Sequence, residues 1–260
     1  MSRQASISVV AAIAAALAVA ACGDSKETAA KPDARPEPPN QGLPQGSEPS
    51  RLDPADFTTD IDNPYWPMRP GARWVYRASD TTGKREQVVV TVTDRTRKIA
   101  NGIVARVVRD VVTEGGSPTE VTDDWYAQDS AGNVWYLGEA TAEYEDGKVI
   151  NRDGSFEAGK DGAQPGIAMP ADPEPGLSYR QEYYKGEAED KAGVITVGRE
   201  HVQVPFGFFD KRVLMTRDLV PLEPKVQELK FYVPNVGPVL SIHTDGAGGR
   251  AELVRYTPGR

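Results

Sequence analysis

Hydrophobic and polar residues alternate with a period of two along much of this chain. The clearest examples are the β-branched run 88–93 and the run from Ile103 to Val112. Successive side chains of a β-strand point to opposite faces, so each run predicts a strand. Charged residues occur on both faces of the second run, with Arg109 on one face and Asp110 on the other. This pattern predicts a strand with one buried face and one partly wet face.

Turn sequences separate these runs at the spacing of about 8–12 residues that is typical of all-β proteins. Asp129–Gly132 lies between two aromatic runs and predicts a hairpin turn, and Glu145–Lys148 predicts another. No sustained helical periodicity follows the N-terminal apolar stretch. We therefore predict an all-β domain: a single antiparallel, strongly curved sheet, a sandwich or a half-barrel. Later strands are expected near residues 179–184, 193–204, 208–218, 227–233, 238–244 and 250–256.

The stretch 154–176 departs from this pattern because it is rich in glycine and proline and longer than most loops. It nevertheless carries the apolar residues Phe156, Ile167 and Met169. These residues favour an ordered loop that packs over a face of the sheet. We expect this loop to serve as structural cover for the sheet rather than as a lid over a ligand.

The N-terminus has the pattern of a bacterial lipoprotein signal. Arg3 precedes an alanine-rich apolar stretch, and Leu17–Ala21 then leads into Cys22, the only cysteine of the chain. Small residues directly before a cysteine predict cleavage there and attachment of lipid, including palmitate, to the Cys22 thiol. The alternative is an ordinary cleaved signal peptide that leaves a free thiol.

A proline-rich segment follows the cysteine as far as about Asp56 and contains almost no large apolar residue. Such a composition predicts a disordered, extended spacer. The expected organisation is a signal peptide at 1–21, the lipidated cysteine and linker at 22–56, and an all-β domain at 57–260. The expected location is the cell envelope, outside the cytoplasm, with the N-terminal lipid as the contact with the membrane.

Composition limits the partners and the chemistry. The 260 residues carry a formal net charge of −8, which disfavours nucleic acid as a partner. With one cysteine, two histidines and no G-x-S-x-G motif, we expect no catalytic residues, no metal site and no cofactor.

His243 and Asp245 could share a strand end, but a surface histidine is the simpler interpretation. Acidic residues near predicted turns could serve as calcium ligands, but solvated charge is the better interpretation for all of them: Asp123, Asp124, Glu143, Glu145, Asp146, Glu187, Glu189 and Asp190.

Three segments resemble a family of bacterial secreted proteins and lipoproteins without an assigned activity. They are the NPYWPxxPGxxWxY opening at 63–76, the WYAQDxxGNVWYxGE hairpin at 125–139, and the run MPADPEPGLSYRQEYYKGEAED at 169–190. The resemblance covers nearly all of the chain from Ile61 to Tyr256. It implies an all-β architecture and supplies no catalytic residues.

The leading hypothesis is a non-enzymatic envelope protein that binds a small apolar or amphipathic ligand or scaffolds an envelope partner. Two alternatives remain open: an exported hydrolase that uses acidic residues on carbohydrate, and a purely structural envelope adaptor. A convergent pair of carboxylates beneath an open cleft would favour the hydrolase. Aromatic and polar side chains on neighbouring predicted strands are the candidate ligand-binding residues: Trp125, Tyr126, Trp135, Arg180, Glu182 and Tyr184.

Overall fold

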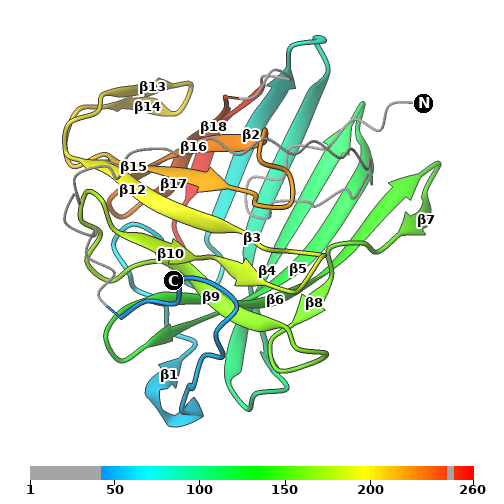
Figure 1. Cartoon of the computed structure of the whole chain (residues 1–260). Helices are drawn as coiled ribbons and strands as arrows, with labels where there is room; N and C mark the ends of the chain where they lie inside the picture. Colours follow the sequence, from blue (N-terminus) through cyan, green and yellow to red (C-terminus); the bar gives the residue numbers. More distant parts are fainter. Residues whose placement is uncertain (1–41, 245–248) are drawn as a thin grey trace, which may run out of the picture.

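The computed structural model describes residues 42–244 and 249–260. Regular structure in these ranges is almost entirely β (Figure 1). No helix among them is long and apolar enough to cross a membrane. The first part of the chain forms η1 (Pro54–Asp56), β1 (Phe57–Thr58), β2 (Arg73–Asp80), β3 (Arg85–Lys98), β4 (Val104–Glu114), β5 (Ser117–Asp129), β6 (Val134–Glu145), β7 (Lys148–Asn151), β8 (Phe156–Glu157) and β9 (Gln164–Met169).

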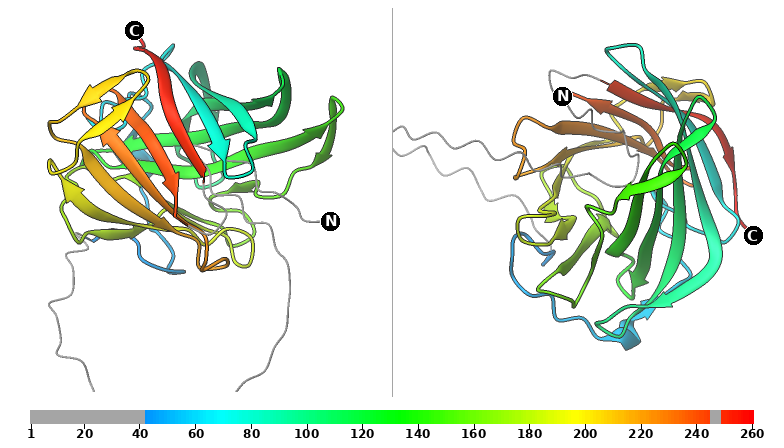
Figure 2. Two further views of the ribbon diagram at one scale, coloured as in Figure 1. Left: turned by 90° about the horizontal axis from the view of Figure 1, so that it is seen from above. Right: turned by 90° about the vertical axis from the view of Figure 1, so that its right-hand side faces the viewer.

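The second part continues with short strands and then returns to the large sheet. It comprises β10 (Ser178–Arg180), β11 (Glu182–Tyr183), β12 (Lys191–Val197), β13 (Val202–Val204), β14 (Gly207–Phe209), β15 (Leu214–Leu219), β16 (Gln227–Val233), β17 (Gly237–His243) and β18 (Gly249–Thr257). Strands β13 and β14 pair only with each other, and β13 contacts β17 and β18 (Figure 2).

The large sheet is antiparallel and strongly curved, and it nearly closes into a barrel (Figure 2). Its strand order is β10-β12-β15-β16-β17-β18-β2-β3-β4-β5-β6-β9-β11. The two ends of this order, β10 and β11, are consecutive in the chain and are separated by Gln181 alone. The chain itself therefore brings the two ends of the sheet together, at a junction that we call the seam.

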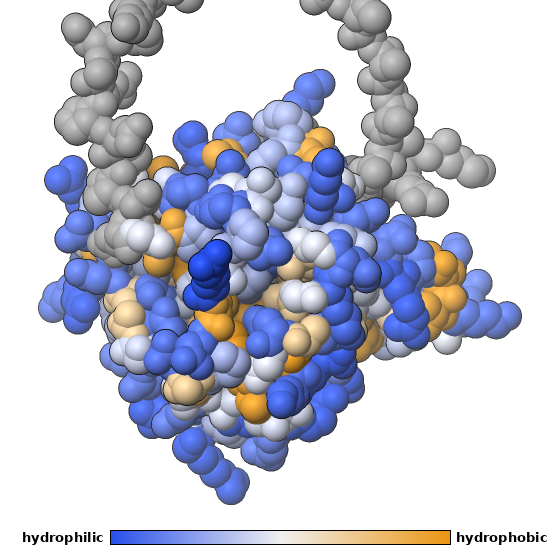
Figure 3. All heavy atoms as spheres, turned by 60° about the horizontal axis from the view of Figure 1, so that its bottom comes forward, coloured by the Kyte–Doolittle hydropathy of each residue, from blue (hydrophilic) through white to orange (hydrophobic). Residues whose placement is uncertain are grey.

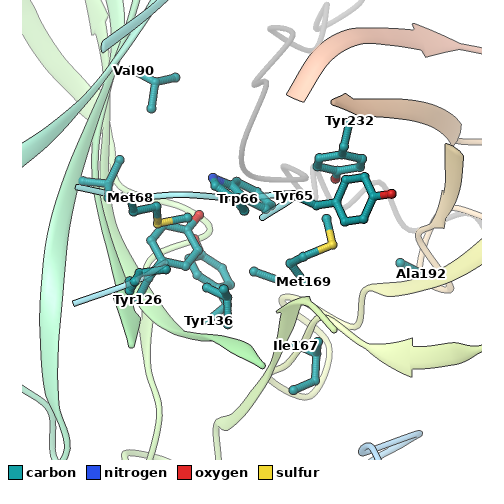
Figure 4. Close-up of a cluster of buried hydrophobic side chains, with 14 of the residues drawn as sticks. Tyr65, Trp66, Met68, Val90, Tyr126, Tyr136, Ile167, Met169, Ala192 and Tyr232 are labelled. Atoms are coloured by element: carbon teal, nitrogen blue, oxygen red, sulfur yellow. The ribbon is translucent and has the colours of Figure 1, made fainter. Parts of the chain in front are cut away.

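Apolar side chains from the inward faces of the strands fill one part of the interior. The segment between η1 and β2 adds Tyr65, Trp66 and Met68 to this core (Figure 4). Asn63 holds the segment in place, because its side-chain amide donates to the backbone oxygens of Gly132 and Pro170. The Trp66 ring lies 5.8 Å from the Tyr126 ring and 5.8 Å from the Tyr232 ring, measured between centroids. The aromatic opening motif at 63–76 is thus a segment that contributes side chains to the core.

The predicted fold class is confirmed, and so are the two hairpin turns. Strands β3 and β4 cover the two alternating runs, and β5 and β6 form the predicted hairpin with Gly132 at a φ of 96°. The second turn lies between β6 and β7, with Gly147 at a φ of 73°. Glycine adopts this left-handed conformation without the steric cost that a Cβ imposes.

The structure differs from the predictions in several places. The expected strands near 193–204 and 208–218 are each divided, into β12 and β13 and into β14 and β15. The stretch 154–176 is ordered and its apolar residues are buried, but it contains β8 and β9 instead of being all loop. The expected strand 179–184 is interrupted at Gln181, where the chain crosses from one end of the sheet to the other. Residues 43–50, expected in the linker, pack on the domain: Leu43 belongs to the core, and Pro44 accepts a hydrogen bond from the Arg180 N–H.

Candidate functional site

Four acidic residues lie on the inward face of three neighbouring strands. They are Asp110 on β4, Glu120 and Asp124 on β5, and Glu139 on β6, and we call them the inner carboxylate cluster. Asp110 pairs with Thr122, and Asp124 pairs with Glu139. Alternation along each strand then places all four side chains on one face. Each is nearly or fully buried, with Asp124 at 0 % exposure.

A β-bulge in β6 brings a tyrosine into the same cluster. Tyr136 and Glu139 are three residues apart, so on a regular strand they would point to opposite faces. The register shifts between Tyr136 and Glu139, because the three steps along β6 from Tyr136 to Glu139 lie opposite the two steps along β5 from Asp124 to Tyr126. Gly138 lies at the shift, with a φ of 127°. The extra residue turns both Tyr136 and Glu139 inward.

The hydroxyl of Tyr136 bridges two carboxyl groups. It lies 2.9 Å from Asp124 Oδ1 and 2.8 Å from Glu139 Oε2. A phenol carries one hydrogen, so it donates one full hydrogen bond, and the second contact requires a donor on a carboxyl group. The geometry therefore favours one proton held between Asp124 and Glu139. The rings of Tyr126 and Tyr136 stack beside this pair, 5.0 Å apart (Figure 4).

Burial changes the protonation of the cluster. Loss of water around Asp124 raises its pKa to about 7, although its hydrogen bond from Tyr136 opposes the shift and Glu120 adds to it. Burial also raises the pKa of Glu139 well above its ordinary value, with the Asp124 charge as the next cause. The charged form of a carboxyl is disfavoured both by loss of solvent and by a like charge nearby.

Asp110 stands out because the described residues supply no hydrogen-bond partner for either of its carboxyl oxygens. The side chain is only 2 % exposed. Burial raises its pKa well above the ordinary value, and the charges of Asp124 and Glu120 add to the shift. The Val111 N–H opposes this shift in part without reaching hydrogen-bond geometry. A buried polar group without a partner costs about 1–3 kcal/mol, so an arrangement of this kind calls for an explanation.

Acidic residues continue along the interior toward the seam. Burial raises the pKa of Glu182, and the Asp190 charge adds to the effect; the pKa of Asp190 rises to about 7. Lys230 supplies a positive charge on this side, with Nζ 2.7 Å from Asp218 Oδ2 and 3.2 Å from Glu228 Oε2. Carboxyl groups thus outnumber cations across the described part of this inner surface.

A pocket of about 290 Å³ opens on the outer side of the same strands. We call it the Trp125 pocket; its walls are formed by Trp125, Glu139, Ala140, Ser155, Phe156, Glu157, Lys160, Asp161, Ala163 and Tyr184. A second pocket of about 390 Å³ shares Trp125 and Ala140 with it. The guanidinium carbon of Arg97 lies 4.0 Å from the centre of the Trp125 ring and partly covers it. Glu139 belongs both to this pocket and to the inner carboxylate cluster.

The six predicted ligand-binding residues do not form a single site. Tyr126 and Glu182 face the acidic interior, whereas Trp125 and Tyr184 line the outer pocket. Trp135 lies on β6 next to the hairpin turn, and its Nε1 donates to Asp129 Oδ2 at 2.8 Å. Arg180 is fully enclosed at the seam, where its guanidinium donates to backbone oxygens. Glu139 connects the acidic interior with the Trp125 pocket, because it belongs to both.

Sequence reasoning missed Asp110, Asp124, Tyr136 and Glu139. Alternation did place Asp110 on the same face as Val108 and Val112, which was a usable signal that this acid shares a face with core residues. The interpretation of Asp124 and Asp190 as solvated turn charge was wrong, because both are buried inside the sheet. Acidic side chains usually lie at the surface, and their burial here depends on the tertiary structure, which a single sequence does not reveal.

Two other candidates lie apart from this site or outside the described residues. His243 Nε2 lies 3.8 Å from Glu228 Oε1, while its predicted neighbour Asp245 is not among the described residues. Cys22 and the signal peptide are also outside them. Within residues 42–244 and 249–260, no group of three or more His, Cys, Asp or Glu side chains is arranged to hold a metal ion.

We expect the free energy of unfolding to fall as the pH rises from about 4 to about 7. The folded protein keeps a proton on Asp124 up to a pKa of about 7, while the unfolded chain loses it near pH 4. The folded state binds more protons in this window, so each retained proton contributes a slope of about −1.4 kcal/mol per pH unit. Urea unfolding at several pH values measures this slope.

Asp124→Asn should make the slope shallower, because the amide still accepts from Tyr136 and has no proton to lose. Asp123→Asn is the matched control: this outer carboxylate is paired with Arg109 and Arg95, which lower its pKa and move its titration below the window. Equal slopes for the wild type and Asp124→Asn would contradict the burial argument.

Neither a family model nor a curated protein matches this chain. Solved structures do resemble it. A predicted lipoprotein from Parabacteroides distasonis has 14 % identity and a TM-score of 0.40, over 75 % of this chain and 99 % of that chain. A predicted exported protein with a YmcC-like fold from Bacteroides fragilis has 16 % identity and a TM-score of 0.41, over 75 % and 99 %.

A β-barrel-like protein of the domain family DUF1849 from Brucella abortus has 14 % identity and a TM-score of 0.38, over 73 % of this chain and 98 % of that chain. All three TM-scores are below 0.5. The chain is similar to these three proteins over about three quarters of its length.

Proposed function

We propose that this protein is a non-enzymatic binding protein of the cell envelope, tethered by lipid on Cys22, that holds an amphipathic ligand inside its curved sheet. The observation that carries the proposal is the division of the inner wall. Aromatic rings form one part of the wall, and buried carboxyl groups form the adjoining part, with both oxygens of Asp110 left without a partner among the described residues. A ligand with an apolar body and a polar end matches both parts.

The apolar part of this wall is large and aromatic. Trp66, Tyr126, Tyr136 and Tyr232 meet there (Figure 4). Aromatic side chains supply a large contact area, and tyrosine and tryptophan also offer polar atoms to a bound molecule. The sequence-based interpretation of Trp125 and Tyr184 as ligand contacts is compatible with a second contact region at the Trp125 pocket, which Glu139 joins to the interior.

Native mass spectrometry of the full-length protein extracted from the membrane of its own host tests this proposal. The expected result is a protein mass increased by lipid on Cys22, together with a non-covalent adduct that dissociates at higher collision energy. Expression as Cys22→Ser should remove the covalent lipid and keep the adduct. A wild-type protein with an unmodified thiol would contradict the tether, and the absence of any adduct would contradict the binding function.

The arrangement of the acids argues against the carbohydrate hydrolase. Asp124 and Glu139 do converge on Tyr136, in the manner of a pair of acid catalysts. Both carboxyl groups of a glycosidase must reach the bond that is cleaved. Glu139 lines the Trp125 pocket, but Asp124 is 0 % exposed and does not line it. The pair lies beside a pocket and not beneath an open cleft.

A purely structural adaptor would need a broad apolar surface for its partner. On the face shown in Figure 3, apolar side chains are interspersed with polar ones. Some of the large exposed apolar residues that the structure describes lie on separate strands, for example Val104 on β4 and Ile150 on β7, whereas Phe206 and Val254 lie where the β13–β14 hairpin contacts β18. The interior, by contrast, combines aromatic rings with buried carboxyl oxygens that have no partner among the described residues.

A further inference from the structure

We infer that the polar end of the ligand is an organic ammonium group, held by the carboxylates of Asp110 and Asp124 beside the stacked rings of Tyr126 and Tyr136. This inference rests on the proposed function and names the chemical class of the ligand. Three observations support it: the unpartnered oxygens, the excess of carboxyl groups, and the aromatic rings around them.

The unpartnered oxygens show which kind of atom is needed. Both oxygens of Asp110 and the Oδ2 atom of Asp124 are buried without a hydrogen-bond partner among the described residues. A carboxylate accepts hydrogen bonds, so a partner must bring N–H or O–H donors. Charge-assisted hydrogen bonds from an ammonium group to a carboxylate are roughly twice as strong as neutral ones.

The charges around Asp110 favour a cation over a neutral donor. Asp110 and Thr122 are register partners, which places Glu120 and Asp124 diagonally next to Asp110 on the same face. The other titratable groups that act on Asp110 or Asp124 are the Tyr76, Tyr126 and Tyr136 hydroxyls and the Asp123, Glu139 and Glu182 carboxyls. None of these is basic. Lys230 is already paired with Asp218 and Glu228.

Aromatic rings complete an environment that suits an ammonium ion. Tyr126 lies two residues from Asp124 on the same face of β5. Its ring stacks on that of Tyr136, whose hydroxyl lies 2.9 Å from Asp124 Oδ1. A cation over an aromatic face gains about 0.5–2 kcal/mol, most where water is excluded. Carboxylates beside tyrosine rings therefore select a cationic head group.

Isothermal titration of the full chain with octylammonium, octanol and octanoate tests the inference, because these probes share one alkyl chain and differ in head-group charge. We expect octylammonium to bind at least tenfold more tightly than octanol, and octanoate most weakly. Affinity for octylammonium should fall as the pH is lowered from 8 to 5, since carboxylates become protonated while the amine stays charged below about pH 10. Octanol affinity should not change.

Asp110→Asn should reduce octylammonium affinity about tenfold and leave octanol affinity unchanged. It should also stabilise the free protein at pH 8, because it removes a buried charge, so lost binding is distinguishable from lost folding. Asp124→Asn provides a second variant with the same expected loss. Asp123→Asn, which alters an outer carboxylate on the same strand, should bind like the wild type.

The ways in which the inference can fail are distinguishable. Equal binding of octylammonium and octanol, or an Asp110→Asn variant with wild-type affinity for octylammonium, would overturn the ammonium assignment and leave the amphipathic binding function standing. Binding of none of the three probes, together with the absence of a native adduct, would overturn the proposed function itself.

Discussion

Replacing Arg180 with methionine should lower the free energy of unfolding by about 3 kcal/mol or more. Its guanidinium holds three segments together at the seam, because it donates to the backbone oxygens of Pro165, Gly46 and Glu48 and to the Ser50 hydroxyl. The side chain is 1 % exposed. Methionine would leave the buried Pro165 oxygen and the three part-buried acceptors at Gly46, Glu48 and Ser50 without this donor, and a buried unsatisfied group costs about 1–3 kcal/mol.

Chemical denaturation followed by circular dichroism measures this loss. Arg180→Lys should recover only a small part of it, because an ammonium group lacks the planar fork that reaches several acceptors at once. Arg217→Met is the control: this arginine lies on β15 but is exposed, so a change within about 0.5 kcal/mol is expected. Equal denaturation midpoints for Arg180→Met and the wild type would show that the seam does not depend on this side chain.

Gly166→Ala should destabilise the protein by about 3 kcal/mol or more, although it adds a single methyl group. A Cβ at this position would lie 2.1 Å from the Gln181 oxygen and 2.6 Å from the Arg180 oxygen. Both are backbone atoms of the step that joins β10 to β11, so they have no alternative rotamer. Strand β9 and the crossing chain would have to move apart.

Gly193→Ala is the matched control for this substitution. Gly193 also lies in a strand near the seam, but the Leu177 oxygen, the nearest atom that an alanine methyl group would meet there, is 3.8 Å away. Ordinary contact and the smaller entropy of the unfolded alanine chain predict an effect between neutral and about 1 kcal/mol stabilising. Thermal unfolding of the two variants side by side provides the measurement. A loss of the same size in both would mean that the close approach at Gly166 is not the cause.

Much of the β architecture could be predicted because its signals are local. Alternation at 88–93 and 103–112 reflects the two faces of a strand, which is a property of the backbone itself. The turn at Asp129–Gly132 also depends on neighbours in the chain: Asp129 accepts hydrogen bonds from the Asn133 N–H and side chain, and Gly132 supplies the left-handed conformation. Such features require no knowledge of distant residues.

Most of the candidate site could not be predicted, because it depends on contacts between residues far apart in the sequence. Alternation shows that Asp110 and Val108 share a face, but closure of the sheet decides whether that face is enclosed. The extra residue that turns Glu139 inward appears only when β5 and β6 are paired. Asp190 lies far from Asp124 in the sequence, and the barrel brings both into the interior.

The sequence by itself determined many of the strands, the two hairpin turns and the absence of local helical pattern, because backbone geometry and turn chemistry act over a few residues. The tertiary structure alone decided that β10 and β11 meet, that residues 43–50 pack on the domain, and that acidic side chains share an enclosed wall with tyrosine rings. These features depend on contacts between positions far apart in the chain. Their free energies come from exclusion of water and close approach, which exist only once the sheet has curved around its interior.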